Sequence, residues 1–235
     1  QTCALPISTT ERVCLPVAQA RELSERALRG IGYDAEEARI IADHAIDAAL
    51  CGYEYSGLPK LLNIPDSRRF RHPRSPLRVV RETSVSVMYD AGNNVGMLAM
   101  YYATRAAIER AEKHGIGVVG MTNSWMSGRS AYYVEMVAKA NLVGIHTVSA
   151  DRQVAPFGGA KAALGTNPIA FGFPTAGEPL VIDMGTSAFM GTDVKFRERL
   201  GIPLPEGVAI DENGKPTTRS EEHTSELQSR ETISY

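Results

Sequence analysis

The chain has 235 residues, 43% of them hydrophobic and 22% charged, and its formal net charge is −2. These values are typical of a globular protein with one large domain or two small ones. The near-neutral balance gives no electrostatic case for nucleic acid or an anionic membrane surface as a partner. No apolar run approaches the roughly 20 residues that a membrane helix needs, so no membrane partner is expected either.

The cysteines and histidines predict no metal site. Cys3, Cys14 and Cys51 have neither metal-binding nor redox spacing, and three cysteines cannot all pair with one another. A reducing cytoplasm is the default location for such a chain. No two histidines have the spacing of metal ligands, and a structural role is expected for each.

The two ends of the chain differ from its middle. Residues 1–8 and 219–235 read as translated sequence of a common DNA-library adapter, in opposite orientations. We interpret both segments as adapter-derived rather than natural, and we expect 219–235 to be disordered because it is polar and has no helical or strand period. The alternative is a natural polar tail. On the first interpretation the natural segment covers roughly residues 9–218, and its C-terminal part is missing.

The first part of the natural segment predicts two helices. Residues 16–30 begin with a proline, which suits a first helical turn, and residues 34–50 begin at Asp34, a good N-cap. The stretch from Gly52 to Pro65 is predicted to be irregular. The arginine-rich segment 66–76 is predicted to be a solvated loop, which is the usual fate of such a run of charges.

The middle of the chain predicts short apolar strands that alternate with helices. The expected strands are 85–89, 116–121, 143–149, 169–173 and 180–184, and the expected helices are about 95–113, capped by Asn94, and about 130–140. A hairpin-like turn is expected at 211–214. This alternation indicates an α/β layer architecture.

One apparent dinucleotide motif is a coincidence on this interpretation. Residues 115–120 read Gly-Ile-Gly-Val-Val-Gly, which matches the G-x-G-x-x-G fingerprint. That fingerprint needs a strand before it and a helix that begins inside it. Here a helix is predicted to end at Gly115 and a strand to begin at Ile116, so we expect no Rossmann site.

The block from Phe157 to Pro174 is the most informative stretch of the chain. It alternates glycine and proline with apolar residues, which shapes the backbone as well as filling a core. Such a surface presents bare N–H groups to a phosphate or to a nicotinamide amide. Asp183 then ends the next apolar strand, and two roles stay open for it: to orient a catalytic group or to cap a turn.

Two loops carry reactive side chains. Residues 51–60 crowd two tyrosines, a serine and a lysine into a glycine-flexed loop, which favours a display of reactive groups; the alternative is a helix C-cap with two half-buried tyrosines. Residues 123–129 hold the only tryptophan, Trp125. It either walls a pocket or belongs to the core.

At these positions the sequence resembles the malate/L-lactate dehydrogenase family that is unrelated to Rossmann-type lactate dehydrogenases. The resemblance covers the natural segment and rests above all on Gly165-Thr166-Asn167-Pro168, followed by Asp183-Met184. It implies a non-Rossmann, three-layer α/β/α fold with a mixed sheet and an N-terminal helical subdomain. On this basis residues 9–76 form the helical, substrate-loop subdomain, and residues 77–218 form a cofactor-binding α/β domain. The resemblance also implies NAD or NADP as cofactor and a homodimer at full length.

The resemblance assigns candidate site residues one by one. The residues matching cofactor contacts, or lying beside them, are Ser149, Gly165, Thr166, Asn167, Pro168, Asp183, Met184, Gly185 and Ser187. On the substrate side the family has serine-histidine-glycine and then an arginine, where this chain has Tyr55, Ser56, Gly57 and Lys60. A second family histidine is Ser124 here, and Asp183 matches the aspartate that supports the catalytic histidine.

The implied activity is hydride transfer between a nicotinamide and C2 of a small 2-keto or 2-hydroxy acid, with Lys60 binding the substrate carboxylate. Tyr55, Ser56, Ser124 and Asp183 are the candidate catalytic residues. General acid catalysis is worth about 10²–10⁴-fold, and serine is a very weak acid, so Tyr55 or Tyr53 is the expected proton donor. Two alternatives stay open: a reductase of cyclic ketimines, whose nitrogen can arrive already protonated, and a cofactor-binding family member without activity. We expect the chain as written to be inactive.

Overall fold

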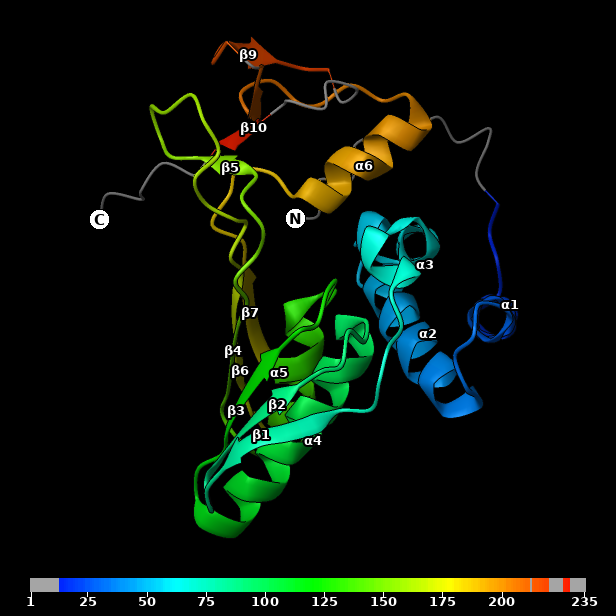
Figure 1. Cartoon of the computed structure of the whole chain (residues 1–235), viewed down its shortest axis with the longest axis vertical. Coiled ribbons are helices and arrows are strands. Elements are labelled where there is room, and N and C mark those ends of the chain that lie inside the picture. The colour runs from blue at the N-terminus through cyan, green and yellow to red at the C-terminus, as the bar shows by residue number, and fades with distance from the viewer. Residues whose placement is uncertain (1–12, 212, 220–225, 229–235) are drawn as a thin grey trace. The chain divides into compact units, whose positions relative to one another are not determined.

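The computed structural model describes residues 13–211, 213–219 and 226–228 (Figure 1). Its contacts divide the chain into two units, one comprising residues up to 110 together with 116–129, the other 111–115 together with the residues from 130 onward. Both units combine helices with strands, and the described residues contain six α-helices and several small sheets. The predicted mixed α/β class is confirmed.

The N-terminal helices form as the sequence predicts, with one addition. Helix α1 spans Val17–Gly30, and α2 spans Ala35–Leu50. The Asp34 side chain accepts a hydrogen bond from the Glu37 N–H at 2.9 Å, and the Glu37 side chain accepts one from the Asp34 N–H at 3.0 Å, which completes a capping box. The predicted N-cap is therefore confirmed.

A third helix stands where an irregular stretch was predicted. A 3₁₀ turn, η2, covers Glu54–Ser56, and α3 covers Leu58–Asp66. The prediction of irregular structure is therefore wrong for α3. Its two prolines are compatible with a helix, because one lies in the first turn, where a missing N–H costs nothing, and Pro65 lies in the last turn. Burial of Ile64, which is 0% exposed, supplies the stabilisation that the local sequence lacks.

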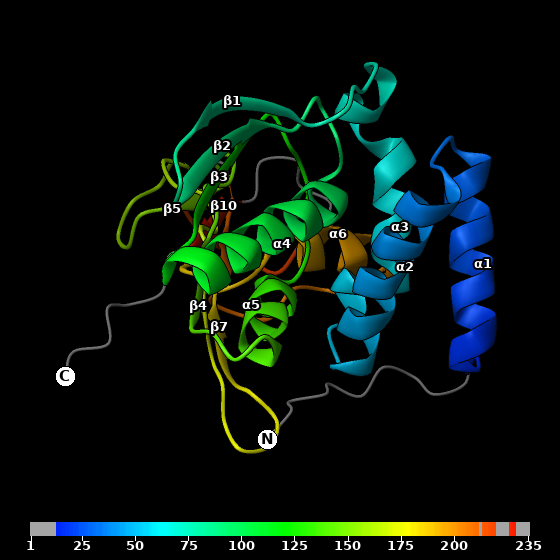
Figure 2. The same cartoon turned by 90° about the horizontal axis from the view of Figure 1, so that it is seen from below.

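A mixed three-stranded sheet and a long helix complete the first unit. Strands β1 (Arg78–Glu82) and β2 (Ser86–Asp90) pair antiparallel, and β3 (Val118–Thr122) pairs parallel with β2 (Figure 2). Helix α4 (Gly96–His114) connects β2 to β3. Gly115, with φ +81°, follows the end of this helix and precedes β3, so the G-x-G-x-x-G match has the wrong structural order, as predicted.

The core of the first unit explains why the division of the chain differs from the predicted boundary between residues 76 and 77. The core cluster combines side chains of α1, α2 and α3 with side chains from the start of α4, and its members include Leu28, Ile40, Ile41, Ile64, Val95, Met97 and Leu98. Because the start of α4 shares a core with the N-terminal helices, these elements belong to one unit. Trp125 also packs against this cluster, which favours the core alternative for the tryptophan.

A helix packed on an antiparallel sheet dominates the second unit. Helix α5 (Ser130–Lys139) contacts the sheet formed by β4 (Gly144–Thr147), β6 (Ile169–Phe173) and β7 (Leu180–Met184), in the order β4-β6-β7 (Figure 1). Gly144 and Gly172 are register partners on neighbouring strands. A methyl group on either would come closer than 3.0 Å to the Val137 side chain or the Val134 carbonyl oxygen. The helix therefore approaches the sheet where the sheet has no side chains.

The remaining described elements are short. They are α6 (Gly191–Leu200), β5 (Val154–Ala155), β8 (Ala209–Ile210), β9 (Pro216–Thr217) and β10 (Glu226–Gln228), and the four strands form one sheet in the order β5-β10-β8-β9. Strands β8 and β9 pair antiparallel across the predicted turn, where the Asp211 side chain accepts hydrogen bonds from the N–H groups of Asn213 and Lys215. The hairpin prediction is confirmed.

Strand β10 lies in the segment 219–235, which was expected to be disordered. It pairs parallel with β5 and antiparallel with β8, so that expectation is wrong for Glu226–Gln228. Strand pairing uses backbone groups that every non-proline residue carries, so a polar sequence without a strand period can still pair with neighbouring strands. Residues 1–8, 220–225 and 229–235 lie outside the described residues, and the adapter origin of the two ends stays a prediction.

The close packing of α5 on the sheet is testable with one methyl group. We expect Gly172→Ala to lower the free energy of unfolding by about 1–3 kcal/mol, because the new methyl group would force the α5 backbone away from β6. The matched control is Gly177→Ala, since no atom lies within 4 Å of the position its methyl group would take. Urea denaturation of both variants measures the difference, and equal stabilities would contradict the packing described.

Candidate functional site

The ends of three strands meet at one edge of the sheet in the second unit. Thr147, Ile169 and Met184 are register partners across β4, β6 and β7. Because β6 is antiparallel to both neighbours, the segment after β4, the segment before β6 and the segment after β7 all leave the sheet at this edge. These segments carry the residues predicted to bind the cofactor, and the structure brings them together.

Hydrogen bonds tie the three segments to one another. The Val148 N–H donates to the Pro168 carbonyl at 3.1 Å. The Ala150 N–H donates to the Asn167 side-chain oxygen at 3.0 Å, and both the N–H and the hydroxyl of Thr186 donate to the Thr166 carbonyl, at 2.9 and 3.0 Å. The strand-edge cluster, defined here as residues 149–150, 165–168 and 183–187, is therefore one connected structure.

Gly165 and Asn167 occupy positions that few other residues allow, Gly165 because of a close contact and Asn167 because of its backbone conformation. A methyl group at Gly165 would come closer than 3.0 Å to the carbonyl of Ala150, so only glycine permits the approach of these two segments. Asn167 has φ +32°, and its side chain is held by the Ala150 N–H. The glycine-rich block thus shapes the backbone, as its composition predicts.

The segment after β7 divides into an exposed and a buried part. Met184 is 45% exposed, whereas Ser187 is 2% exposed. The Ser187 hydroxyl donates to the Phe189 carbonyl at 2.6 Å. Met184 can therefore contact a ligand directly, while Ser187 holds the turn that follows the strand.

Asp183 caps a helix. Its side chain is half-buried and accepts a hydrogen bond from the Ala131 N–H at 2.8 Å, in the first turn of α5. A carboxylate at this place satisfies one of the free N–H groups of the helix start and complements the positive end of the helix dipole. Of the two roles that the sequence left open, this contact is a capping one, although the cap belongs to a helix rather than to a turn.

A buried histidine shares the sheet face of Asp183. His146 on β4 is opposite Ala170, which is opposite Asp183 on β7. His146 is 8% exposed, and within the described part of the chain neither ring nitrogen has a hydrogen-bond partner. Its ring lies 5.1 Å from the ring of Tyr133 on α5. Burial lowers the pKa of His146 from 6.5 to about 4, so this histidine is neutral at physiological pH.

The predicted substrate loop lies in the first unit, on η2 and the start of α3. Gly57 separates them, and a methyl group there would come within 2.8 Å of the Ala49 side chain on α2, so the loop is packed tightly on that helix. Ser56 is 5% exposed and Lys60 is 4% exposed, whereas Tyr55 is half-buried. The Tyr55 ring meets the Tyr53 ring edge-on at 6.0 Å. Tyr53, Tyr55, Ser56 and Lys60 thus lie on one short segment, in which Ser56 and Lys60 are buried.

Ser124 lies in the loop that follows β3. This loop contains left-handed backbone at Asn123, Met126 and Gly128, with φ of +53°, +60° and +81°. The Trp125 carbonyl accepts the Gly96 N–H at 2.5 Å, and the Trp125 indole donates to the Asn93 carbonyl at 3.0 Å. Ser124 is therefore half-buried in a loop whose backbone is fixed against the start of α4.

A polar cluster that the sequence did not predict holds the end of this loop. The His44 Nε2 accepts a hydrogen bond from the Arg129 N–H at 2.9 Å, and the Arg129 guanidinium donates to Asp47 at 2.6 and 3.2 Å. A methyl group at Gly128 would collide with the His44 ring. His44 and Asp47 are three residues apart on α2, which places them on one helix face; that spacing is the signal that could have indicated the pair.

Among the described residues, no group of three or more histidine, cysteine, aspartate and glutamate side chains is arranged to hold a metal ion. No helix in the part of the chain that the structure describes is long and apolar enough to cross a membrane.

The helices and mixed strands of this chain define a non-Rossmann α/β protein, with a glycine-shaped cluster of backbone groups at the ends of three antiparallel strands. The sequence profile of the malate/L-lactate dehydrogenase family matches residues 15–229, so the chain belongs to this family. The match extends into the segment 219–235.

Relatives and solved structures agree with this assignment. The chain is 37% identical over 201 residues to a malate dehydrogenase of Pyrococcus abyssi, and 35% identical over 199 residues to hydroxycarboxylate dehydrogenase B of Escherichia coli K12. These matches cover 84% and 83% of this chain but 55% of each relative, so the chain spans about half the length of the curated relatives it matches.

Among solved structures, a putative malate/lactate dehydrogenase from E. coli superposes with a TM-score of 0.84 at 31% identity, over 93% of this chain and 63% of that one. The Δ1-piperideine-2-carboxylate reductase from Pseudomonas syringae superposes with a TM-score of 0.79 at 28% identity, over 93% of this chain and 67% of that one. The fold is therefore that of this dehydrogenase family.

The burial of His146 predicts a dependence of stability on pH. A histidine whose pKa is 6.5 when unfolded and about 4 when folded stabilises the protein above pH 6.5, and this contribution is lost as the pH falls toward 4. We expect the wild type to lose about 3 kcal/mol more than His146→Leu between these two pH values. Urea denaturation as a function of pH measures this, with His72→Gln at an exposed histidine as the control. A parallel decline in wild type and His146→Leu would contradict the prediction.

The Arg129–Asp47 pair predicts a second stability effect. The Arg129 side chain is 5% exposed and that of Asp47 is 32% exposed, so Asp47→Asn removes one charged partner from a buried guanidinium. We expect a loss of about 2–3 kcal/mol in the free energy of unfolding. The matched control is Asp43→Asn on the same helix, since Asp43 pairs with Arg21 and Arg39 near the surface and should lose less than about 1 kcal/mol. Similar losses of unfolding free energy in both variants would show that the buried pair stabilises the protein no more than the exposed one.

Proposed function

We propose that the protein is an NAD- or NADP-dependent oxidoreductase that transfers hydride between nicotinamide and C2 of a small 2-keto or 2-hydroxy acid. The observation that carries the proposal is the strand-edge cluster, because it gathers Ser149, residues 165–168 and residues 183–187 at one edge of a sheet. Family membership supports it, since relatives are named malate, sulfolactate and hydroxycarboxylate dehydrogenases.

The residues of this cluster fit a nicotinamide cofactor. Met184 offers an exposed apolar side chain for a flat ring, and Ser149 offers an exposed hydroxyl. Gly165 permits the close approach of the segment after β4, and Asn167 holds a left-handed turn beside it. A bound nicotinamide would supply or accept the hydride. The part of the protein is to hold the ring and to exclude water around it.

Lys60 is the proposed partner of the substrate carboxylate. Its side chain is 4% exposed on the first turn of α3. Attraction between a carboxylate and an ammonium group is stronger in such a low-dielectric environment than in water. Lysine binds the carboxylate as a point charge without the two-pronged geometry of arginine, so it fixes the position of the substrate less sharply than an arginine would.

Proton transfer to the reduced oxygen is assigned to a tyrosine. Ser56 and Ser124 stand where the family has histidines, and a serine hydroxyl is too weak an acid for this task. Tyr55 is half-buried next to Ser56, and Tyr53 packs against it. We propose Tyr55 as the donor, with Tyr53 as the second candidate. Asp183 then acts as a positioning residue through its contact with α5.

A second candidate function is the reduction of a cyclic ketimine. The observation that favours it is the pair of serines at the histidine positions, because an imine protonated on nitrogen needs hydride but no further proton. The structural similarity to a piperideine-2-carboxylate reductase supports this alternative. The same two serines also favour a third candidate, a family member that binds the cofactor without catalysing a reaction.

Two further properties belong to the proposal. We propose a homodimer, in line with the family resemblance, and a cytoplasmic location. The second rests on the cysteines: the sequence has three, which cannot all pair with one another, and such a pattern suits a reducing compartment.

The experiment is a panel of substrates offered with NADH and with NADPH, using the chain and a version extended to the full length of the relatives. Loss of absorbance by the reduced cofactor reports turnover. General acid catalysis is worth about 10²–10⁴-fold in rate, and this chain has Ser56 where the family has the histidine that protonates a ketone oxygen. We therefore expect cyclic ketimine carboxylates to react faster than pyruvate-like keto acids. Tyr55→Phe should slow keto-acid reduction while the matched variant Tyr53→Phe does not.

The possible outcomes separate the candidates. Equal or faster turnover of keto acids contradicts the ketimine preference and supports 2-keto acids as substrates. Saturable cofactor binding without turnover of any substrate by the extended version supports the binding protein. An extended version that binds neither cofactor contradicts all three candidates.

A further inference from the structure

A cavity of about 700 Å³ lies in the first unit, apart from every residue proposed for the reaction. Its walls come from α2, the segment before β1, strand β2 and helix α4, and the lining residues used below are Glu37, Arg74, Tyr89, Leu98, Tyr102, Arg105 and Glu109. The volume is in the range of small-molecule sites in proteins.

An ion pair between Arg74 and Glu37 forms one wall of the cavity. The Arg74 guanidinium donates to both carboxylate oxygens of Glu37, at 2.5 and 2.6 Å, and to the Asn94 side-chain oxygen at 3.1 Å. It also donates to the Gly32 carbonyl at 3.0 Å and lies 4.6 Å from the centre of the Tyr33 ring. The charges of Arg74 and Glu37 therefore cancel, and their side chains are held in place.

Hydrogen bonds fix the segment before β1 as a second wall. The Ser75 N–H donates to the Gly92 carbonyl at 2.9 Å, and the Asn94 amide donates to the Ser75 carbonyl at 2.7 Å. The Asn93 amide donates to the carbonyls of Arg69 and His72 at 3.0 and 3.2 Å. The predicted solvated loop is thus exposed but anchored, and Asn94 anchors this segment instead of capping α4 as predicted. The cavity is pre-formed, which lowers the cost of binding.

The remaining walls combine aromatic side chains with one available cation. Tyr89 and Tyr102 are half-buried, and burial raises the pKa of Tyr102, so its hydroxyl stays neutral. Arg105 and Glu109 are exposed and lie four residues apart on one face of α4. No acidic side chain in the described part of the chain forms a salt bridge with Arg105.

The segment that leads into β1 is basic. Residues 68–81, which include most of that strand, contain six arginines and no acidic residue. Two of these arginines, Arg74 and Arg78, pair with Glu37 and Asp90. Such a concentration of one sign of charge raises the local concentration of anions. A guanidinium forms paired hydrogen bonds to a carboxylate, and it is weakly hydrated, so it loses little when it leaves water. Arg105 is therefore the side chain of this wall that is suited to bind an anionic ligand.

We propose that this cavity binds a small aromatic carboxylate, with the ring against Tyr89 and Tyr102 and the carboxylate on Arg105. The tyrosines and Leu98 supply flat apolar surface, and Arg105 supplies the charge that the Arg74–Glu37 pair does not. The carboxylate of Glu109 repels ligands that carry a second negative charge. The site is independent of the proposed reaction, because no residue assigned to that reaction lines it.

The test is calorimetric titration of the 235-residue chain with three probes of one shape: naphthoate, the uncharged naphthamide and the cationic naphthylmethylammonium. We expect saturable binding of naphthoate with Kd below about 1 mM, weaker binding of the amide and the weakest of the cation. Added salt should weaken the binding of naphthoate but not that of the amide.

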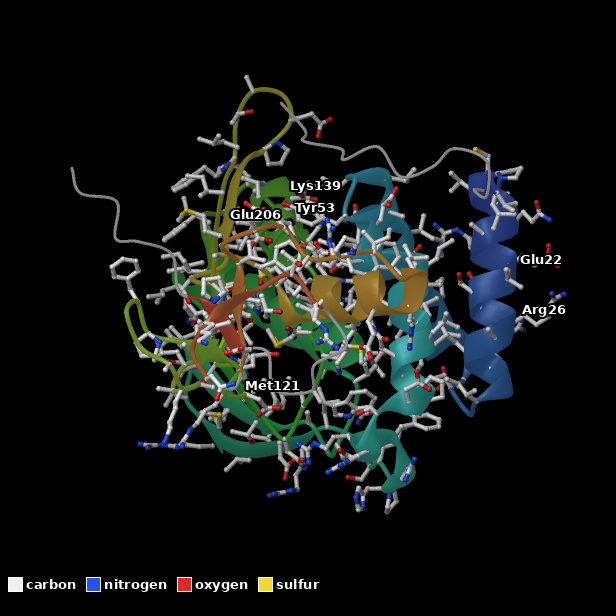
Figure 3. All side chains as sticks on the ribbon, turned by 90° about the horizontal axis from the view of Figure 1, so that it is seen from above. Glu22, Arg26, Tyr53, Met121, Lys139 and Glu206 are labelled. Atoms are coloured by element: carbon white, nitrogen blue, oxygen red, sulfur yellow. The ribbon has the colours of Figure 1, made fainter. Side chains whose placement is uncertain are left out.

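Matched variants locate the site. Arg105→Gln should lower the affinity for naphthoate about tenfold. The affinity of Arg105→Lys should lie between that of Arg105→Gln and that of the wild type. Glu109→Gln should raise the affinity about twofold, because it removes a nearby like charge. The controls are Arg26→Gln and Glu22→Gln, whose side chains extend from α1 into solvent (Figure 3) and which should change nothing.

Four outcomes would overturn the proposal. They are the absence of saturable binding by naphthoate, a loss in Arg105→Gln no larger than in Arg26→Gln, a lower affinity in Glu109→Gln, and tighter binding of the cation than of the anion. Circular dichroism of each variant verifies that the helices are retained, so a loss of binding reports the site and not the fold.

Discussion

The contact between α5 and its sheet is the constraint on which the second unit depends. Because Gly144 and Gly172 carry no side chains, the helix backbone comes close to β4 and β6. Asp183 on β7 can then reach the Ala131 N–H in the first helical turn. The same register holds the ends of the three strands together. The hydrogen bonds from Thr186 to Thr166 and from Ala150 to Asn167 complete the strand-edge cluster. The proposed cofactor surface therefore rests on helix packing as much as on its own glycines.

In the first unit, polar side chains rather than helix packing fix the backbone of two loops. His44 and Asp47 on α2 hold the end of the loop after β3 through Arg129, and Asn93 and Asn94 hold the arginine-rich segment before β1. In each case a glycine, Gly128 or Gly92, lets the partner approach. These contacts give rigid loops around Ser124 and around the cavity on α4. Rigid loops favour a binding function, since little conformational entropy is lost when a ligand binds.

The local sequence predicted the long elements well, and it was less successful where stabilisation comes from packing. The capping box at Asp34 and the hairpin at Asp211 follow from nearest neighbours, so both were predictable. Helix α3 was missed because its two prolines argue against a helix until Ile64 is seen to enter the core. The contact-based division of the chain differs from the predicted boundary after residue 76, because the start of α4 shares a core with α1, α2 and α3.

The sequence by itself determined the family, the α/β class and the false nature of the G-x-G-x-x-G match, because all of these depend on order and spacing along the chain. Only the tertiary structure decided that Lys60 is buried, that Asp183 caps α5, that Arg129 pairs with Asp47 and that a cavity lies between α2 and α4. Burial and pairing depend on residues tens of positions apart. A linear pattern does not specify those distances, whereas packing of the helices on their sheets does.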